Sequence, residues 1–231
     1  ERIFYDFIKN DIIPATLNGY ESSTLLIIHA QRKRKRYYYE NNEPLPRAKE
    51  LGNRYDIIIA PTSGLMPEFL YDKFGHKDTK VIIFDYEQVF LDVKQQILEY
   101  GFVGNDLLHY MSYLSSQYPK KEWIFACERT PNQKEAFRKN DHIVKDASRM
   151  IDKLAETNYE MRLVNMLSDD FKWIDELVKD KTVICYISNI FQYYITWLYC
   201  DTNTIIDQYN KLDKALQSAN SYKLYGRSWH E

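Results

Sequence analysis

Asp56-Ile-Ile-Ile-Ala-Pro-Thr-Ser-Gly64 and Lys80-Val-Ile-Ile-Phe-Asp-Tyr-Glu87 are the two stretches that decide the fold. Each contains an uninterrupted apolar run, which is typical of a strand that is buried on both faces of a parallel sheet. The first run ends in a turn of small residues, and the segment between the two runs is long enough for a short helix. The sequence therefore predicts a strand, helix, strand unit at the centre of a parallel sheet.

The same alternation continues along the chain. Residues 88–100 carry apolar side chains at helical spacing, Tyr100 included, and Gly101 is of the type that ends helices. Beyond this helix the pattern predicts, in order, a strand at 159–167, a helix capped by Asp169 or Asp170 that runs to Val178, a strand at 182–187, a helix from Asp201 or Thr202, and an edge strand at 222–225.

Two segments stand outside this alternation. Residues 1–54 form an N-terminal extension, in which residues 25–30 and the run after Arg32 are expected to pair as a β-hairpin. Residues 105–157 are mainly helical in pattern and are predicted to form an insertion or lid. The whole chain, residues 1–231, is thus expected to be a single α/β domain, Rossmann-like, with a mostly parallel sheet and helices on both faces.

Composition limits the classes of function. With 31 basic and 33 acidic side chains the net charge is −2, which argues against general binding of nucleic acid. The three cysteines, Cys127, Cys185 and Cys200, form no Cys-x-x-Cys pair and are expected to be reduced thiols of a cytoplasmic protein. No signal peptide is recognisable, and a start at Glu1 is expected of a processed chain or of part of a larger polypeptide. The uncharged run 183–200 is interrupted by polar residues, so we predict no membrane span.

The turn Ala60-Pro61-Thr62-Ser63-Gly64 and the strand end Asp85-Tyr86 are the first candidate sites. Small residues between a strand and a helix let backbone N–H groups approach a ligand. A carboxylate at the end of the next strand can accept hydrogen bonds from both ribose hydroxyls. A purely structural explanation is equally open, because Gly64 can serve a positive φ angle and Asp85 can cap a helix.

In the order and spacing of these elements the chain resembles a class I S-adenosylmethionine-dependent methyltransferase. The resemblance covers roughly residues 55–100 and 158–192. It implies that the 60–64 turn binds the methionine part of S-adenosylmethionine and that Asp85, beside Tyr86, binds the ribose. It implies that Ser168, Asp169 and Asp170, after the third strand, bind the adenine of the cofactor, and that Ser188 and Asn189, after the fourth, contact the cofactor on the acceptor side. Domains of this general kind also occur joined to glycan-building enzymes, including those of large DNA viruses.

The resemblance implies methyl transfer, which requires an aligned acceptor and, for a hydroxyl acceptor, a general base but no metal. The candidate bases are His109, His142, Asp170 and Asp201. An aromatic cluster between residues 191 and 199 suits a sugar ring or a planar base, or else forms a core wall. We therefore expect an O-methyltransferase that acts on a saccharide or another small molecule, with a sugar of a glycan as the favoured acceptor.

Two other functions remain open. Asp85-Tyr86-Glu87 resembles the acid-x-acid motif by which metal-dependent glycosyltransferases hold a divalent cation against a nucleotide sugar. The basic run from Arg32 to Arg36, followed by three tyrosines, is either a solvated hairpin tip or a surface for nucleic acid or a protein partner in a non-catalytic module. The ligands discriminate these functions: S-adenosylmethionine without metal, a nucleotide sugar only with metal, or no small ligand.

Overall fold

The computed structural model describes residues 35–38, 52, 54–62, 64–101, 123–126, 141–187, 190–191 and 200–226. A five-stranded sheet forms the centre, in the order β5-β3-β2-β6-β7, and each neighbouring pair is parallel. The strands are β2 (Ile57–Pro61), β3 (Lys80–Asp85), β5 (Asn158–Leu163), β6 (Thr182–Tyr186) and β7 (Ser221–Tyr225). Numbered along the chain this is the order 3-2-1-4-5 of a Rossmann-like α/β sheet, which confirms the predicted fold class at this level.

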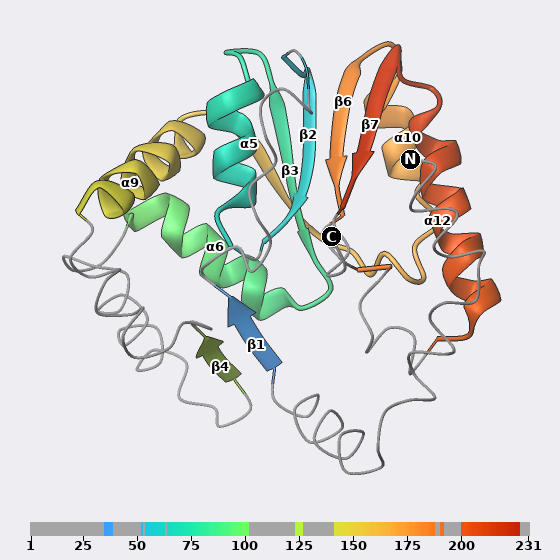
Figure 1. Ribbon diagram of the computed structural model, residues 1–231, viewed down its shortest axis with the longest axis horizontal. Helices are drawn as coiled ribbons and strands as arrows, with labels where there is room; N and C mark the ends of the chain where they lie inside the picture. Colours follow the sequence, from blue (N-terminus) through green and yellow to red (C-terminus); the bar gives the residue numbers. More distant parts are fainter. Residues whose placement is uncertain are drawn as a thin grey trace.

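Helices cover both faces of the sheet (Figure 1). On one face lie α5 (Met66–Phe74), α6 (Gln88–Tyr100) and α9 (Asp141–Ala155). On the other face lie α10 (Lys172–Val178) and α12 (Thr202–Leu216). The central strands are therefore shielded from water on both sides, which is the physical reason for their continuous apolar runs.

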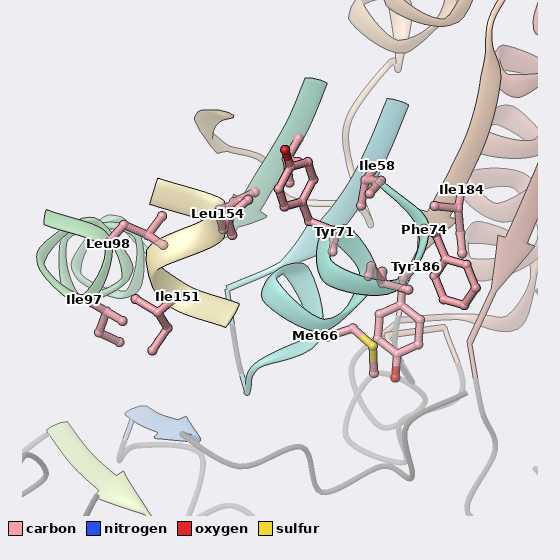
Figure 2. Close-up of a cluster of buried hydrophobic side chains, with 14 of the residues drawn as sticks. Ile58, Met66, Tyr71, Phe74, Ile97, Leu98, Ile151, Leu154, Ile184 and Tyr186 are labelled. Atoms are coloured by element: carbon pink, nitrogen blue, oxygen red, sulfur yellow. The ribbon is translucent and has the colours of Figure 1, made fainter. Parts of the chain in front are cut away.

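Successive strand residues point to opposite faces and so build two cores. Ile58, Ile83 and Ile184 pack towards the face covered by α5, α6 and α9, where Figure 2 shows Tyr71 between Leu154 and Ile58. The other core joins strand residues to α10 and α12; its members include Ile59, Phe84, Cys185, Ile174 and Leu212. Each large apolar side chain that is fully buried stabilises the fold by about 2 kcal/mol.

Helix ends follow local chemistry. Helix α6 has the predicted bounds and ends at Gly101, whose φ of 68° suits glycine. Tyr100, predicted on the buried stripe, is exposed instead, because the helix end extends past the core. Asp201 caps α12 as predicted, since its carboxylate accepts a 2.9 Å hydrogen bond from the Thr204 N–H.

The start of α10 differs from the prediction. The capping position is Phe171, whose φ of 56° is left-handed, and neither predicted Asp occupies it. Both carboxylates still accept backbone hydrogen bonds at the start of the helix. Asp169 accepts one from the Phe171 N–H at 2.7 Å, and Asp170 accepts one from the Lys172 N–H at 3.2 Å. The burial of the Phe171 ring in the core holds this unusual backbone conformation.

Two further predictions concern the segments outside the main sheet. Strand β4 (Trp123–Ala126) interrupts the 105–157 segment, which we predicted as helical, because Trp-Ile-Phe-Ala favours a strand. It pairs in parallel with β1 (Lys35–Tyr38), whereas the predicted hairpin arm at 25–30 lies outside the described residues. Helix α9 confirms a helix within 141–155, and it packs against α5 and α6 in the layer on the sheet.

Helix α9 is also fixed to α5 by charge. Asp72 of α5 accepts hydrogen bonds from Arg149 of α9, at 2.6 Å to Nη1 and 3.0 Å to Nη2. Lys153, one turn further along α9, donates to the same carboxylate at 3.1 Å. The hydrogen bond from Arg149, followed by that from Lys153, holds the pKa of Asp72 well below its ordinary value despite partial burial.

Candidate functional site at the carboxyl edge of the sheet

The carboxyl ends of β2, β3 and β5 bring the candidate residues together. Strand β2 is followed by α5 on one face, and β6 leads to α12 on the other (Figure 1). The chain thus reverses its direction of winding between β2 and β6, and in open parallel sheets ligands bind outside the strand ends at such a point. The candidate turn after β2 and Asp85 at the end of β3 lie on neighbouring strands at this edge.

Asp85 is the most unusual of these residues. It is only 8% exposed, its Oδ2 accepts a hydrogen bond from the Thr62 hydroxyl, and its Oδ1 accepts one from the Glu87 N–H at 3.2 Å. Burial raises its pKa to about 6, even though these hydrogen bonds favour the ionised form. At neutral pH the carboxylate is therefore mostly ionised but poorly hydrated.

Two exposed apolar side chains flank this carboxylate. Tyr86 follows it directly and is 64% exposed, and Leu163, which is paired with Asp85 across the sheet, is 58% exposed. Tyr100 is the third exposed large apolar side chain in the part of the chain that the structure describes. Two of these three thus lie beside one buried acid, an arrangement that suits a ligand with a planar apolar part next to vicinal hydroxyls.

Leu163 was not a candidate in the sequence. It lies inside the predicted strand 159–167, where alternation places every second residue on a buried face. The signal that could have found it is the end of the strand: β5 stops at Leu163, beyond which the Val164 N–H bonds to the Asp85 carbonyl at 2.8 Å. A strand end next to a candidate acid is part of the same edge.

The turn after β2 is mostly buried. Ala60 and Thr62 have no exposed surface, Pro61 is buried in the last position of the strand, and Ser63 lies outside the described residues. Thr62 therefore orients Asp85 and does not itself face solvent. Gly64 has a φ of 68°, a conformation that residues with a side chain rarely adopt, so the glycine meets a backbone requirement here.

A buried ion pair between α5 and α6 contacts this turn. Lys94 of α6 and Glu68 of α5 have no exposed side-chain surface and lie 2.6 Å apart, from Nζ to Oε1. Lys94 Nζ also donates to the Gly64 carbonyl oxygen at 2.9 Å. Sequence reasoning missed both residues because charged side chains in an amphipathic helix are expected on its solvent side.

After β5, the carboxylates of two candidate cofactor residues, Asp169 and Asp170, make contacts within the fold. The Asp169 carboxylate is used within the fold, since its Oδ1 also accepts a 3.1 Å hydrogen bond from the Trp173 indole N–H. Ser168 and Asp170 are exposed, and the Lys172 ammonium lies 2.8 Å from Asp170. The hydrogen bond from that ammonium lowers the pKa of Asp170, which weakens it as a general base.

The other candidate bases are spread over the chain. Asp201 caps α12, and hydrogen bonds from Thr204 lower its pKa, so it too is weakened as a base. His142 belongs to α9, with its side chain outside the described part. His109 lies outside it altogether, as do Ser188, Asn189, Cys127 and most of the aromatic cluster. Phe191 of that cluster is a core residue, whose ring meets Tyr209 edge-on at 5.7 Å.

Among the described residues, no cluster of metal ligands at this edge supports the metal-dependent glycosyltransferase alternative. Across the described ranges, no group of three or more His, Cys, Asp or Glu side chains is arranged to hold a metal ion. Asp85 is buried and directed at Thr62. The Asp85-Tyr86-Glu87 sequence motif is therefore not joined by a third acidic or histidine ligand among the residues with described positions.

The fold and the site together define an α/β protein with a Rossmann-like parallel sheet and a polar site at its carboxyl edge. A scan against protein-family models found no match, and searches of curated proteins and of solved structures returned no similar protein. Among the helices that the structure describes, none has the length and apolar character needed to cross a membrane.

Proposed function

We propose that the chain is an S-adenosylmethionine-dependent methyltransferase that acts on a hydroxyl group, with a sugar of a glycan as the acceptor. The observation that carries the proposal is the buried Asp85 carboxylate between the exposed side chains of Tyr86 and Leu163. Adenosine has the matching parts: two neighbouring ribose hydroxyls that donate to a carboxylate, and a planar base that packs on apolar surfaces. The strand order around this site supports the same proposal.

Each residue of the site has a task in this proposal. Asp85, oriented by Thr62, accepts hydrogen bonds from the ribose hydroxyls, and Tyr86 and Leu163 contact the base. The turn at Gly64 lets the backbone approach the amino-acid part of the cofactor. S-adenosylmethionine, when bound, supplies an activated methyl group, so the protein has to align the acceptor and accept its proton.

The proposed acceptor has separate support. The net charge of −2 disfavours a polyanionic acceptor, and the residues from 193 to 199 include aromatic side chains of the type that pack on sugar rings. These residues come after β6 in the sequence, and the resemblance implies that the segment after this strand serves the acceptor side.

Calorimetric titration of the purified chain with S-adenosylhomocysteine tests the proposal. We expect binding without added metal. A titration with nucleoside diphosphate sugars, with and without Mn²⁺, tests the alternative in parallel. Binding of only the nucleotide sugar, and only with Mn²⁺, or no binding of either ligand, would reject the methyltransferase.

Two tyrosine variants make the test specific to the site. Tyr86→Ala should weaken S-adenosylhomocysteine binding by about 1–3 kcal/mol, the usual value of a base stacked on an aromatic ring. Tyr100→Ala is the matched control, because Tyr100 is even more exposed, at 74%, but lies at the end of α6. Neither change should alter the free energy of unfolding by more than about 0.5 kcal/mol, as is usual for exposed side chains. Equal affinities in the two variants would remove Tyr86 from the site.

A further inference from the structure

The Glu68–Lys94 pair is a buried feature that the proposed chemistry does not use directly. Both side chains are fully buried between α5 and α6, and their charged atoms are 2.6 Å apart. The second carboxylate oxygen, Glu68 Oε2, has no hydrogen-bond partner in the described part of the chain. A buried ion pair whose hydrogen bonds are incomplete is a poor way to stabilise a core, and apolar residues of similar size usually serve at least as well.

Apolar residues could not replace one contact of this pair, the hydrogen bond from Lys94 to the turn after β2. Lys94 Nζ donates to the Gly64 carbonyl oxygen at 2.9 Å, and Gly64 has the left-handed φ of 68°. In a planar trans peptide the C=O and the next N–H point in opposite directions. Holding the Gly64 carbonyl towards α6 therefore directs the Leu65 N–H away from α6, and it fixes the plane of the peptide that connects β2 to α5.

We propose that Glu68 and Lys94 are positioning residues for the ligand-binding turn: Lys94 holds the Gly64 peptide in its binding orientation, and Glu68 holds the Lys94 ammonium. The ligand-binding part of this inference rests on the proposed function. The part that concerns the order of the turn does not, because it depends only on the contacts among Gly64, Glu68 and Lys94.

A double substitution tests the proposal without leaving a lone buried charge. Glu68→Leu with Lys94→Met removes both charges, so the midpoint of thermal unfolding should stay equal or rise. Hydrogen exchange of peptides covering residues 62–70 should nevertheless become faster. The affinity for S-adenosylhomocysteine should fall about tenfold, comparable to the loss when groups that orient metal ligands are removed. A merely structural pair would not change affinity in a variant of undiminished stability.

A conservative variant provides the rescue and guards against misfolding. In Glu68→Gln with Lys94→Gln the amide at position 94 can still donate to the Gly64 carbonyl, so slow exchange and tight binding should be partly restored. Arg149→Met is the matched control, because it removes one of the two α9 cations that pair with Asp72, near the opposite end of α5 from the turn, and should leave both readouts unchanged.

The outcomes separate the two proposals. Faster exchange at 62–70 in the Leu–Met variant, reversed in the Gln–Gln variant, supports the positioning role even if the unmodified chain binds no S-adenosylhomocysteine, a result that would reject only the proposed function. Exchange at 62–70 that equals that of the unmodified chain in both variants overturns the positioning role, whatever the affinity. Faster exchange with unchanged affinity overturns the link between the turn and binding.

Discussion

An aspartate lies at the amino edge of the central sheet and another at its carboxyl edge, and folding shifts their pKa values in opposite directions. At the amino edge, Asp56 precedes β2, and its Oδ2 accepts hydrogen bonds from the Thr182 N–H at 2.8 Å and the Thr182 hydroxyl at 2.7 Å. At the carboxyl edge, Asp85 ends β3 and is almost completely buried. The hydrogen bond from the Thr182 backbone, more than any other contact, lowers the pKa of Asp56, whereas burial raises the pKa of Asp85.

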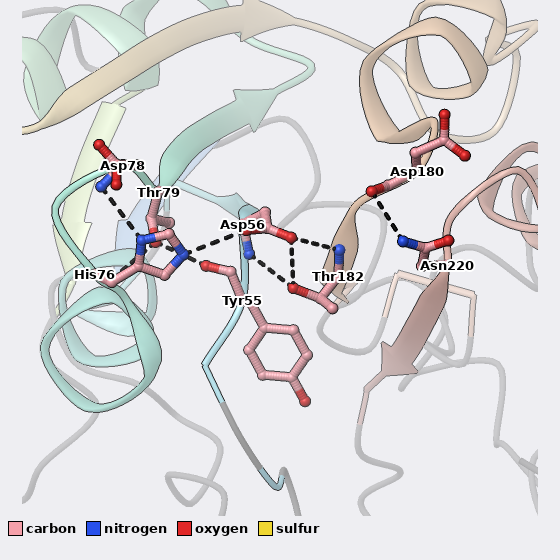
Figure 3. Close-up of polar contacts among 8 residues, drawn as sticks. All are labelled: Tyr55, Asp56, His76, Asp78, Thr79, Asp180, Thr182 and Asn220. Carbon is pink, nitrogen blue, oxygen red and sulfur yellow. Dashed lines mark hydrogen bonds and ion pairs between the residues drawn. The ribbon is translucent and has the colours of Figure 1, made fainter.

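Polar groups at the amino edge form a connected network of hydrogen bonds (Figure 3). The His76 Nε2 lies 3.4 Å from Asp56 Oδ1, and the backbone N–H of His76 donates to the Thr79 hydroxyl at 2.8 Å. Thr79 in turn donates to the Tyr55 carbonyl at 2.7 Å. These contacts connect the loop between α5 and β3 to the starts of β2 and β6.

The comparison teaches where this fold gains stability and where it loses it. The Asp56 carboxylate is partly hydrated and well supplied with donors, so its ionised form stabilises the folded state. The Asp85 carboxylate is dehydrated, so its ionised form costs stability. Binding sites commonly contain ionised side chains that lower the free energy of unfolding. The position of Asp85 at the carboxyl edge of the sheet therefore fits a binding site.

The largest effect should come from Asp85→Asn. A pKa raised from 3.8 to about 6 means that the ionised side chain costs about 3 kcal/mol of folding free energy above pH 6. Because the folded state holds the proton more tightly, this cost is absent below pH 3.8 and grows as the pH rises to 6. The variant should therefore be more stable than the unmodified chain at pH 8 by about 3 kcal/mol and equally stable at pH 3.5. Urea denaturation at a series of pH values measures the difference.

The same variant sharpens the functional side of the comparison. Asp85→Asn should weaken binding of S-adenosylhomocysteine by about 1–3 kcal/mol, the usual range for a hydrogen bond to a charged group. Greater stability with weaker binding would mark a functional carboxylate. A variant that is less stable than the unmodified chain at pH 8 would show that Asp85 is a structural cap.

A smaller effect of opposite sign is expected at the other edge. Asp56→Ala removes the acceptor of two hydrogen bonds from Thr182 and should destabilise the fold by about 1–2 kcal/mol at pH 7. Since the pKa of Asp56 is lowered on folding, its charge stabilises above pH 3.8, and this part is lost as the pH falls through the lower folded value. Ligand affinity should not change. A ligand effect as large as that of Asp85→Asn would contradict the division between the two edges.

The smallest effect should follow from His76→Gln. The His76–Asp56 contact is long, at 3.4 Å, and both side chains are partly exposed, so the loss should stay below about 1 kcal/mol in thermal unfolding. In the Asp56→Ala background the His76 substitution should cost less, because its partner is absent. Equal costs in the two backgrounds would show that the two side chains do not interact.

Most of the central sheet could be predicted from the sequence. The apolar runs of β2, β3 and β6 and the helical spacing of α6 and α12 reflect local periodicity that burial on one or both faces imposes. Periodicity does not encode partners across the chain, however. It missed β4 inside a segment of helical pattern, and it could not assign β1 the parallel partner that begins 88 positions later, at Trp123 opposite Lys35.

The candidate site was predictable only in part. Asp85 and Gly64 could be found because a strand end and a turn leave marks in the sequence. The roles of Thr62, Leu163 and Lys94 depend on contacts with residues that are distant along the chain, such as Lys94 with Gly64, 30 positions earlier. Lys94 has the sequence signature of a solvent-facing residue in an amphipathic helix, and only its three-dimensional surroundings show that it is buried.

The pairing of β2 with β6 has a consequence for the making of the protein. Asp56 and Thr182 are 126 positions apart, so the central strand of the sheet gains its second neighbour only after more than half of the chain has followed it. Pairings of such high contact order form slowly. During synthesis on the ribosome, β2 and β3 are the first strands of the central sheet to emerge, and β2 keeps an open hydrogen-bonding edge until β6 arrives. An open strand edge of this kind is where a nascent chain is exposed to aggregation.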